Sequence, residues 1–218
     1  MKNTQFPRRA FLLGALTLGA LPFLQGCFTV AATGVTAGVL MVADRRTSGA
    51  YLEDESIEWK ANARIRENFG TLNHINVTSY NRVVLLTGEV QSPDISAKAE
   101  RQISAIENIR GVVNELKVAN PSSLSARAND SLITSNIKGL FLDSQRFHAN
   151  HVKVITEANI VYLMGMVTAA EANAASEIAS KGKGVSKVVR VFEKPYLEEA
   201  EARRLDGTPH RDDGPREP

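Results

Sequence analysis

Apolar and polar residues alternate along this chain in a pattern that occurs twice. Residues 74–90 align without a gap on residues 151–167, an offset of 77 positions. Each copy has apolar residues at every second position, then a polar turn, and then a second apolar strand that ends in Gly-x-Val, and this order is typical of a β-hairpin. The sequence therefore predicts two equivalent hairpins.

Apolar residues at three- to four-residue spacing predict a helix before and after each hairpin. The leading helices carry Ile57, Ala61, Ile65 and Phe69 in the first copy and Ile133, Ile137, Leu140 and Phe141 in the second. The following helices carry Ile95, Ala99, Ile103 and Ile106 in the first copy and Ala170, Ala174 and Ile178 in the second. A glycine then introduces a last strand, 111–118 or 184–191.

Each unit therefore reads α-β-β-α-β. We predict an α+β fold of two tandem units, each a small mixed sheet with two helices on one face. A unit of about 60 residues is marginally stable alone, so we expect the two units to pack on each other.

The N-terminus has the organisation of a lipoprotein signal peptide. Basic residues precede an apolar stretch, 11–24, and small Gly26 stands directly before Cys27. Cys27 is the only cysteine of the chain and so has no partner for an intramolecular disulfide. We predict that 1–26 is removed and that Cys27 becomes a triacylated first residue, which anchors the protein stably to a membrane.

Two features near the anchor leave alternatives open. Arg8 and Arg9 resemble the twin-arginine export signal, although paired arginines also occur in Sec signals, and both routes end outside the cytoplasm. Residues 28–43 are apolar, small and punctuated by glycine. A second transmembrane helix is the rival interpretation, but 16 residues are short of the roughly 20 that a span needs, so we favour a segment at the membrane surface.

These patterns predict six regions in chain order. They are a signal peptide (1–26), an anchored N-terminal segment (27–52), a first folded unit (53–119), a linker (120–129), a second folded unit (130–193) and a disordered charged tail (194–218).

Charge and motifs exclude several classes of function. The formal charge of +2 falls to −1 once the signal is removed, with 23 basic and 24 acidic side chains, so no basic face for nucleic acid is expected. No nucleophile with a base and no phosphate-binding glycine loop occurs, so we predict neither an enzyme, nor a cofactor, nor a small-molecule substrate. His74, His148 and His151 have no obvious acidic cluster beside them in the sequence, so we interpret them as polar strand caps and expect no metal site.

Gly88 and Gly165 occupy equivalent positions at the end of the two hairpins. A strand glycine usually marks a bulge or a close approach of backbone. We predict a structural role for both, on the hypothesis that a helix packs over the hairpin at that point.

The predicted helix 130–143 carries two leucines away from its core stripe. Leu132 and Leu142 fall on the same flank as Lys138, and Arg146 follows shortly after. Large aliphatic residues beside a cation suit insertion at a lipid interface, although the leucines could equally pack against the first unit or the linker. Trp59 also lies off the core ridge of its helix and is a lesser candidate, although this single tryptophan could equally fill the interface between the two units.

Two α-β-β-α-β units with Leu-x-Gly-x-Val hairpin exits, at 86–90 and 163–167, resemble tandem BON domains. With a lipobox before them and Asp44-Arg45-Arg46-Thr47-Ser48-Gly49 after the anchor, the chain is similar to dual-BON outer-membrane lipoproteins of the DolP (YraP) type. The resemblance covers about residues 20–192.

The resemblance implies a protein without enzymatic chemistry that lies on the periplasmic side of the outer membrane, binds anionic phospholipid and supports envelope integrity. It assigns the lipid contact to the helix of the second unit, with Leu132, Lys138, Phe141, Leu142 and Arg146 as the predicted contact residues. One departure is Leu132, where such proteins tend to have an aromatic residue. The alternative is an adaptor that uses the same patch to dock an envelope or division-machinery protein.

Overall fold

The computed structural model describes residues 44–193 and 197–207. The predicted signal, Cys27, the apolar segment 28–43 and the end of the tail lie outside the described residues. No helix within the described ranges is long and apolar enough to cross a membrane.

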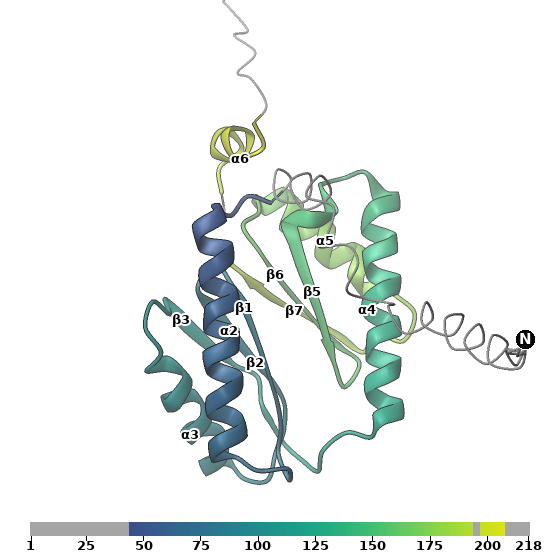
Figure 1. Ribbon diagram of the computed structural model, residues 1–218. Helices are drawn as coiled ribbons and strands as arrows, with labels where there is room; N and C mark the ends of the chain where they lie inside the picture. The colour runs from purple at the N-terminus through teal and green to yellow at the C-terminus, as the bar shows by residue number, and fades with distance from the viewer. Residues whose placement is uncertain (1–43, 194–196, 208–218) are drawn as a thin grey trace, which may run out of the picture. The chain divides into compact units, whose positions relative to one another are not determined.

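The first unit follows the predicted order of elements (Figure 1). It consists of α2 (Ser48–Asn68), β1 (His74–Tyr80), β2 (Val83–Val90), α3 (Pro93–Ser104), β3 (Gly111–Asn114) and β4 (Lys117–Val118). Strand β2 is central, because it pairs antiparallel with β1 and parallel with both β3 and β4.

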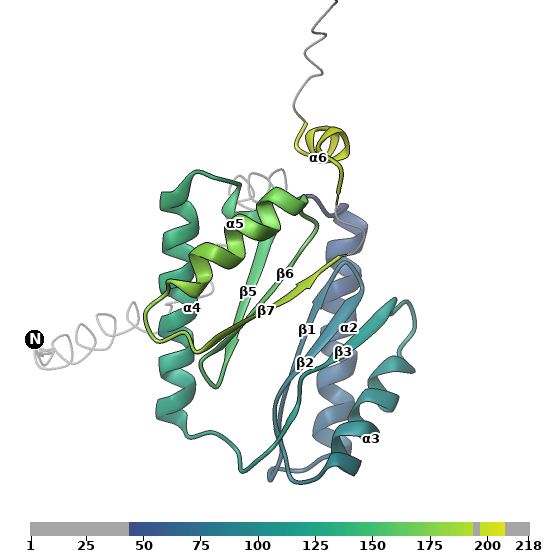
Figure 2. The ribbon, with the colours of Figure 1, turned by 180° about the vertical axis from the view of Figure 1, so that it is seen from behind.

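The second unit repeats this arrangement. It consists of α4 (Leu124–Ser144), the short η3 (Ala149–His151), β5 (Val152–Glu157), β6 (Ile160–Gly165), α5 (Ala169–Ser180) and β7 (Lys187–Phe192). Here β6 is central, antiparallel to β5 and parallel to β7. A further helix, α6 (Glu199–Leu205), follows (Figure 2).

Each sheet buries one face against its own two helices. In the first unit Ile57 and Ala61 of α2 and Ile103 of α3 pack on Val84 and Leu86. The second unit uses the equivalent positions of α4, β5, β6 and α5. The prediction of two α+β units, each with both helices on one face of a mixed sheet, is confirmed.

The opposite faces of the two sheets share a third apolar cluster, formed by Tyr80, Leu85, Ile160, Tyr162 and Met164. The central strands are therefore covered on both faces, which explains why β2 and β6 are almost continuously apolar.

Three predicted details of the helices differ from the structure. Helix α4 begins at Leu124, inside the predicted linker, because the Ser123 hydroxyl accepts a hydrogen bond from the Ala126 amide and caps it. Helix α2 likewise begins at Ser48, before Glu53. The core positions of α5 are Ala172, Ala175 and Ala179, whereas Ala170 of the predicted stripe is exposed.

The predicted last strand of the first unit is divided into β3 and β4. The Asn114 side chain accepts a hydrogen bond from the Leu116 amide at 3.2 Å, an Asx turn that interrupts the strand. The Glu115 amide still donates to the Leu86 carbonyl, so pairing with β2 resumes at Lys117.

The region predicted as a disordered tail contains ordered structure. Within α6 the side chain of Ala202 is buried, and the Leu197 amide donates to the Val167 carbonyl at 3.0 Å. The prediction of disorder throughout 194–218 is therefore wrong for residues 197–207.

Candidate functional site

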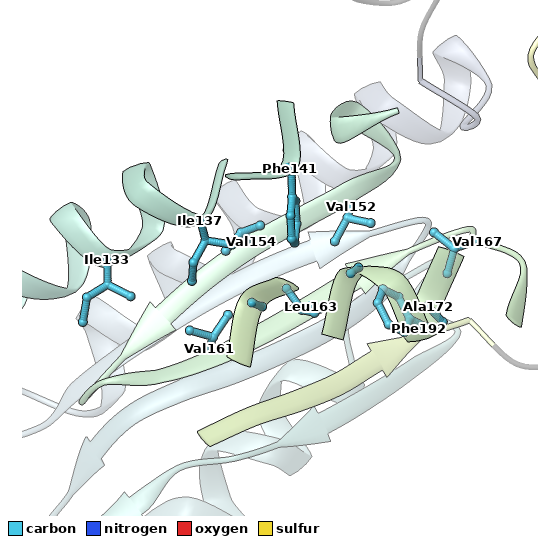
Figure 3. Packing of buried hydrophobic residues seen from close by; sticks show 12 residues of the cluster. Ile133, Ile137, Phe141, Val152, Val154, Val161, Leu163, Val167, Ala172 and Phe192 are labelled. Carbon is cyan, nitrogen blue, oxygen red and sulfur yellow. The ribbon is translucent and has the colours of Figure 1, made fainter. Parts of the chain in front are cut away.

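One face of helix α4 is buried in the core of the second unit. Ile133, Ile137 and Phe141 point from α4 toward the sheet and are at most 3% exposed (Figure 3). The Phe141 ring also meets the Phe147 ring edge to face, with 5.0 Å between centroids. Phe141 therefore cannot reach a membrane from the folded state, and its inclusion among the lipid contacts is wrong, because the 3.6-residue period places it on the same stripe as Ile133 and Ile137.

The outward face of α4 is apolar at three widely spaced positions. Leu124, Leu132 and Leu142 are 82%, 70% and 68% exposed. At 100° per residue Leu124 and Leu142 project in the same direction, and all three lie opposite the core stripe. They extend along roughly 27 Å of helix at 1.5 Å per residue. Leu124 was missed as part of this face, because its Ser-rich surroundings suggested a linker, although Ser123 is a typical N-cap.

Two basic residues lie near this face, and they differ in whether an acidic residue pairs with them. Lys138 is exposed and has no ion-pair partner among the described residues. Arg146 donates to Glu177 at 2.9 Å, and Lys181 bonds the same carboxylate at 2.7 Å. Hydrogen bonds from Lys181 and Arg146 lower the pKa of Glu177 to about 2, so the ion pair persists at neutral pH. Of these two cations, Lys138 is therefore the one that no carboxylate of the described residues binds.

Helix α2 carries a smaller exposed apolar pair. Leu52 and Trp59 are 64% and 72% exposed and lie seven residues apart, which is two helical turns. Trp59 therefore does not fill the interface between the units and stays a second candidate for membrane contact.

The two hairpin glycines are structural, for a reason other than the one predicted. A Cβ on Gly88 would lie 2.0 Å from the His74 carbonyl oxygen, and one on Gly165 would lie 2.3 Å from the His151 carbonyl oxygen. Gly88 also has a φ of +111°. The close approach is to backbone at the start of the partner strand of the same hairpin, His74 in β1 or His151 directly before β5, and the predicted contact with a covering helix is wrong.

The hairpin turns are held by buried aspartates that sequence reasoning missed. Asp54 of α2 accepts hydrogen bonds from the Asn81 and Arg82 amides, and Asp130 of α4 accepts from the two equivalent amides of the second turn. Both residues of each turn have positive φ, as in type I′ turns. One carboxylate from each leading helix thus fixes the turn of the adjoining hairpin. The sequence feature that could have indicated this role is an aspartate at the equivalent position of both leading helices.

Arg45 and Arg46 are neighbours that bind different units. Arg45 donates to Glu171 of α5 at 2.6 and 3.0 Å, to Asp206 at 2.9 and 3.0 Å, and to the Met166 carbonyl. Arg46 donates to Asp54 of the first unit at 2.8 Å, and its guanidinium lies 4.3 Å from the Tyr80 ring centroid. The segment that follows the predicted anchor is therefore tied to both units.

The histidines have different surroundings from those predicted. His148 is exposed, whereas His151 is buried between Glu171, 3.6 Å from Nδ1, and Asp206, 3.3 Å from Nε2. His74 Nδ1 lies 3.1 Å from Glu89 and 3.6 Å from Glu157. The interpretation that no acidic cluster accompanies the histidines is wrong, since Glu157 is brought to His74 only by contact between the two sheets.

Comparison with known proteins agrees with this architecture. The BON domain family model matches residues 53–120 and 129–193. Outer membrane lipoprotein DolP of Haemophilus influenzae is 37% identical over 186 residues, which is 84% of this chain and 95% of that protein. The 21 kDa hemolysin of Actinobacillus pleuropneumoniae is 32% identical over 155 residues (68% of this chain, 78% of that protein). Osmotically-inducible protein Y of Escherichia coli is 29% identical over 161 residues (72% and 80%). The chain therefore belongs to the BON family, as a dual-BON protein of the DolP type.

Proposed function

We propose that this protein is a lipid-anchored outer-membrane protein that faces the periplasm, binds anionic phospholipid through its second BON domain and supports outer-membrane integrity. The observation that carries the proposal is the outward face of α4, with Leu124, Leu132 and Leu142 exposed beside unpaired Lys138. The name of the Haemophilus influenzae relative supports the location and the lipid anchor.

The energetics favour a membrane over bulk water for this face. Full burial of one leucine side chain contributes about 1.5–3 kcal/mol, and one lysine near an anionic surface contributes about 1 kcal/mol. Partial insertion of the leucines with Lys138 at the phosphate level therefore gives moderate affinity, which the lipid at Cys27 would raise by keeping the domain close to the membrane.

The decisive experiment is vesicle flotation of the chain without its anchor. All described residues belong to one compact unit, Val42–Pro218, so this fragment is the one to purify. It is expected to float with vesicles that contain phosphatidylglycerol and to float poorly with phosphatidylcholine alone. Leu132→Glu with Leu142→Glu should abolish flotation while the thermal melt stays close to that of the wild type, because both side chains are exposed.

A matched control uses exposed apolar residues of the first domain. Leu72 and Val118 are 69% and 56% exposed, so Leu72→Glu with Val118→Glu adds the same charge elsewhere. The control variant should bind as the wild type does. Undiminished flotation of the α4 variant would refute the assignment and direct attention to Trp59. Absence of flotation by the wild type would favour the adaptor, for which α4 docks a protein.

A further inference from the structure

The cluster around His74 joins the two BON domains through buried charge. His74 and Glu89 come from β1 and β2 of the first domain, and Glu157 comes from β5 of the second. Glu89 and Glu157 are only 5% and 6% exposed. His74 is the one basic side chain within ion-pair distance of either carboxylate in residues 44–193 and 197–207. Two buried carboxylates with one imidazole leave negative charge uncompensated, which is costly unless a cation or a proton binds.

The distances between the donor atoms suit a small metal ion. His74 Nδ1 lies 3.1 Å from Glu89 Oε2 and 3.6 Å from Glu157 Oε1, and the three donor atoms all lie within 4.8 Å of one another. Zinc bonds to imidazole nitrogen and carboxylate oxygen are about 2.0–2.2 Å long, so two ligands of a tetrahedral site lie roughly 3.3–3.6 Å apart. The two separations from His74 Nδ1 lie near this range, and the combination of nitrogen with carboxylate oxygen is one that zinc accepts.

An unpartnered hydroxyl lies on the same face of the sheet. Thr87 pairs directly with Asn76 in the ladder and stands two residues before Glu89, so its side chain shares their face. Thr87 is 1% exposed, and its Oγ1 has no hydrogen-bond partner. A buried hydroxyl without a partner is uncommon and needs an explanation. A water molecule on a bound metal would supply that partner.

Neighbouring groups already orient the carboxylates. The Asn76 side-chain amide donates to Glu157 Oε2 at 2.6 Å, and the Ser122 backbone amide donates to Glu89 Oε2 at 3.0 Å. Both carboxylates are therefore fixed in orientation, with His74 as the single basic group paired with them among the described residues.

We propose that His74, Glu89 and Glu157 bind one divalent transition-metal ion of the zinc type, with water as the fourth ligand, between the two BON domains. The metal binds His74 at Nδ1, so the ring proton resides on Nε2 in the bound state. The ion bridges the two domains, because His74 and Glu89 belong to the first domain and Glu157 belongs to the second.

The equivalent positions of the second repeat cannot form such a site. His151 matches His74 at the offset of 77, but Met166 stands where Glu89 would be, and Lys153 matches Asn76. His151 instead lies beside Glu171 and Asp206, and both carboxylates also pair with Arg45. The Arg45 guanidinium therefore supplies the positive charge at that position. One ion per chain is therefore expected.

The test uses the full chain, purified in a neutral detergent and treated with EDTA, and Zn²⁺ as the probe. Titration should saturate at one ion per chain by calorimetry, and Zn²⁺ should raise the melting temperature because it binds only the folded state. His74→Gln and Glu157→Gln should each weaken Zn²⁺ binding at least tenfold and abolish the melting shift. His148→Gln changes an exposed histidine outside the cluster and should bind as the wild type does.

A second measurement separates loss of the site from loss of the fold. Co²⁺ in place of Zn²⁺ should give the visible absorption of a four-coordinate site in the wild type and in His148→Gln, and not in Glu157→Gln. Gln at position 157 still accepts the Asn76 hydrogen bond, so this variant is expected to fold even if His74→Gln does not. No melting shift in the wild type, or an unchanged shift in Glu157→Gln, would overturn the proposal.

Discussion

The guanidinium of Arg45 and the carboxylate of Asp206 form two parallel hydrogen bonds, of 2.9 and 3.0 Å, between residues 161 positions apart. Asp206 directly follows α6, and Arg45 stands near the start of the described chain. Because the same guanidinium also bonds Glu171 at the start of α5, one side chain fastens the post-anchor segment and α6 to the second domain.

Replacement of Arg45 should be strongly destabilising. Its side chain is 3% exposed, and Arg45→Ala leaves Glu171 and Asp206 without their main cation. Removal of one partner from a buried ion pair costs about 3 kcal/mol or more, which corresponds to a fall of roughly 6–12 °C in melting temperature for a chain of this size. Arg101→Ala, at an exposed position, is the control and should melt within about 1 °C of the wild type. Equal melting of the two variants would show that the Arg45 contacts contribute no stability.

The same acids predict how stability depends on pH. Burial acts to raise the pKa values of Glu171 and Asp206, but His151 and Arg45 lower the pKa of Glu171 well below the usual range, and Arg45 lowers the pKa of Asp206. The folded state therefore binds fewer protons than the unfolded chain. Their stabilisation is complete above about pH 4.5 and is lost as the pH falls toward the folded-state pKa.

Urea unfolding between pH 7 and pH 3 measures this dependence. The free energy of unfolding should fall with pH below about 4.5 in the wild type. Glu171→Gln should be less stable at pH 7, and its stability should change less on acidification, because one of the ionised groups is absent. A variant curve parallel to that of the wild type would contradict the assignment.

The elements of the fold could be predicted from the sequence, whereas its tertiary bonds could not. The leading helices, the hairpins and their burial follow from apolar periodicity, which local backbone geometry enforces. Helix α5 shows the limit, because alanines occupy so many of its positions that the sequence does not distinguish the buried stripe from the exposed one.

In the candidate site, too, exposure and burial could be predicted from the sequence, whereas contacts between separate elements could not. Exposure of Leu132 and Leu142 follows from the helical period, and so does burial of Phe141. The meeting of Glu157 with His74, and of Asp206 with Arg45, depends on how separate elements pack, and no spacing within the sequence encodes it.

The hairpin glycines should tolerate no side chain. Gly88→Val and Gly165→Val each place a Cβ against a backbone oxygen, and Gly88→Val also strains φ, so each should lose about 3 kcal/mol or more of stability. Gly111→Ala is the control, because no atom lies within 4 Å of the added Cβ, and it should be neutral or slightly stabilising. Thermal melts test this, and wild-type stability of Gly165→Val with altered vesicle binding would instead indicate a binding role.

Membrane attachment should depend on Cys27, which lies outside the described residues. Cys27→Ser should leave precursor uncleaved after Gly26 or release the protein from membranes on fractionation. Phe28 follows the cysteine, so the aspartate that retains some lipoproteins in the inner membrane is missing, and we expect the wild type in the outer-membrane fraction of a density gradient. Firm attachment and normal cleavage of the variant would refute the lipobox assignment.

The two cations beside the α4 leucines should contribute unequally to vesicle binding. Lys138 is unpaired in the described structure, so Lys138→Gln should weaken binding to anionic vesicles about fivefold, from a contribution of about 1 kcal/mol. Lys138→Glu should weaken it further and reduce its dependence on salt, because salt screens the charge interaction and leaves the insertion of Leu132 and Leu142 unaffected. Arg146→Gln should lose less than Lys138→Gln, since Arg146 must first leave Glu177. Titration of the Val42–Pro218 fragment with vesicles at two salt concentrations measures all three variants. A loss for Arg146→Gln as large as that for Lys138→Gln would mean that the ion pair with Glu177 opens at the membrane.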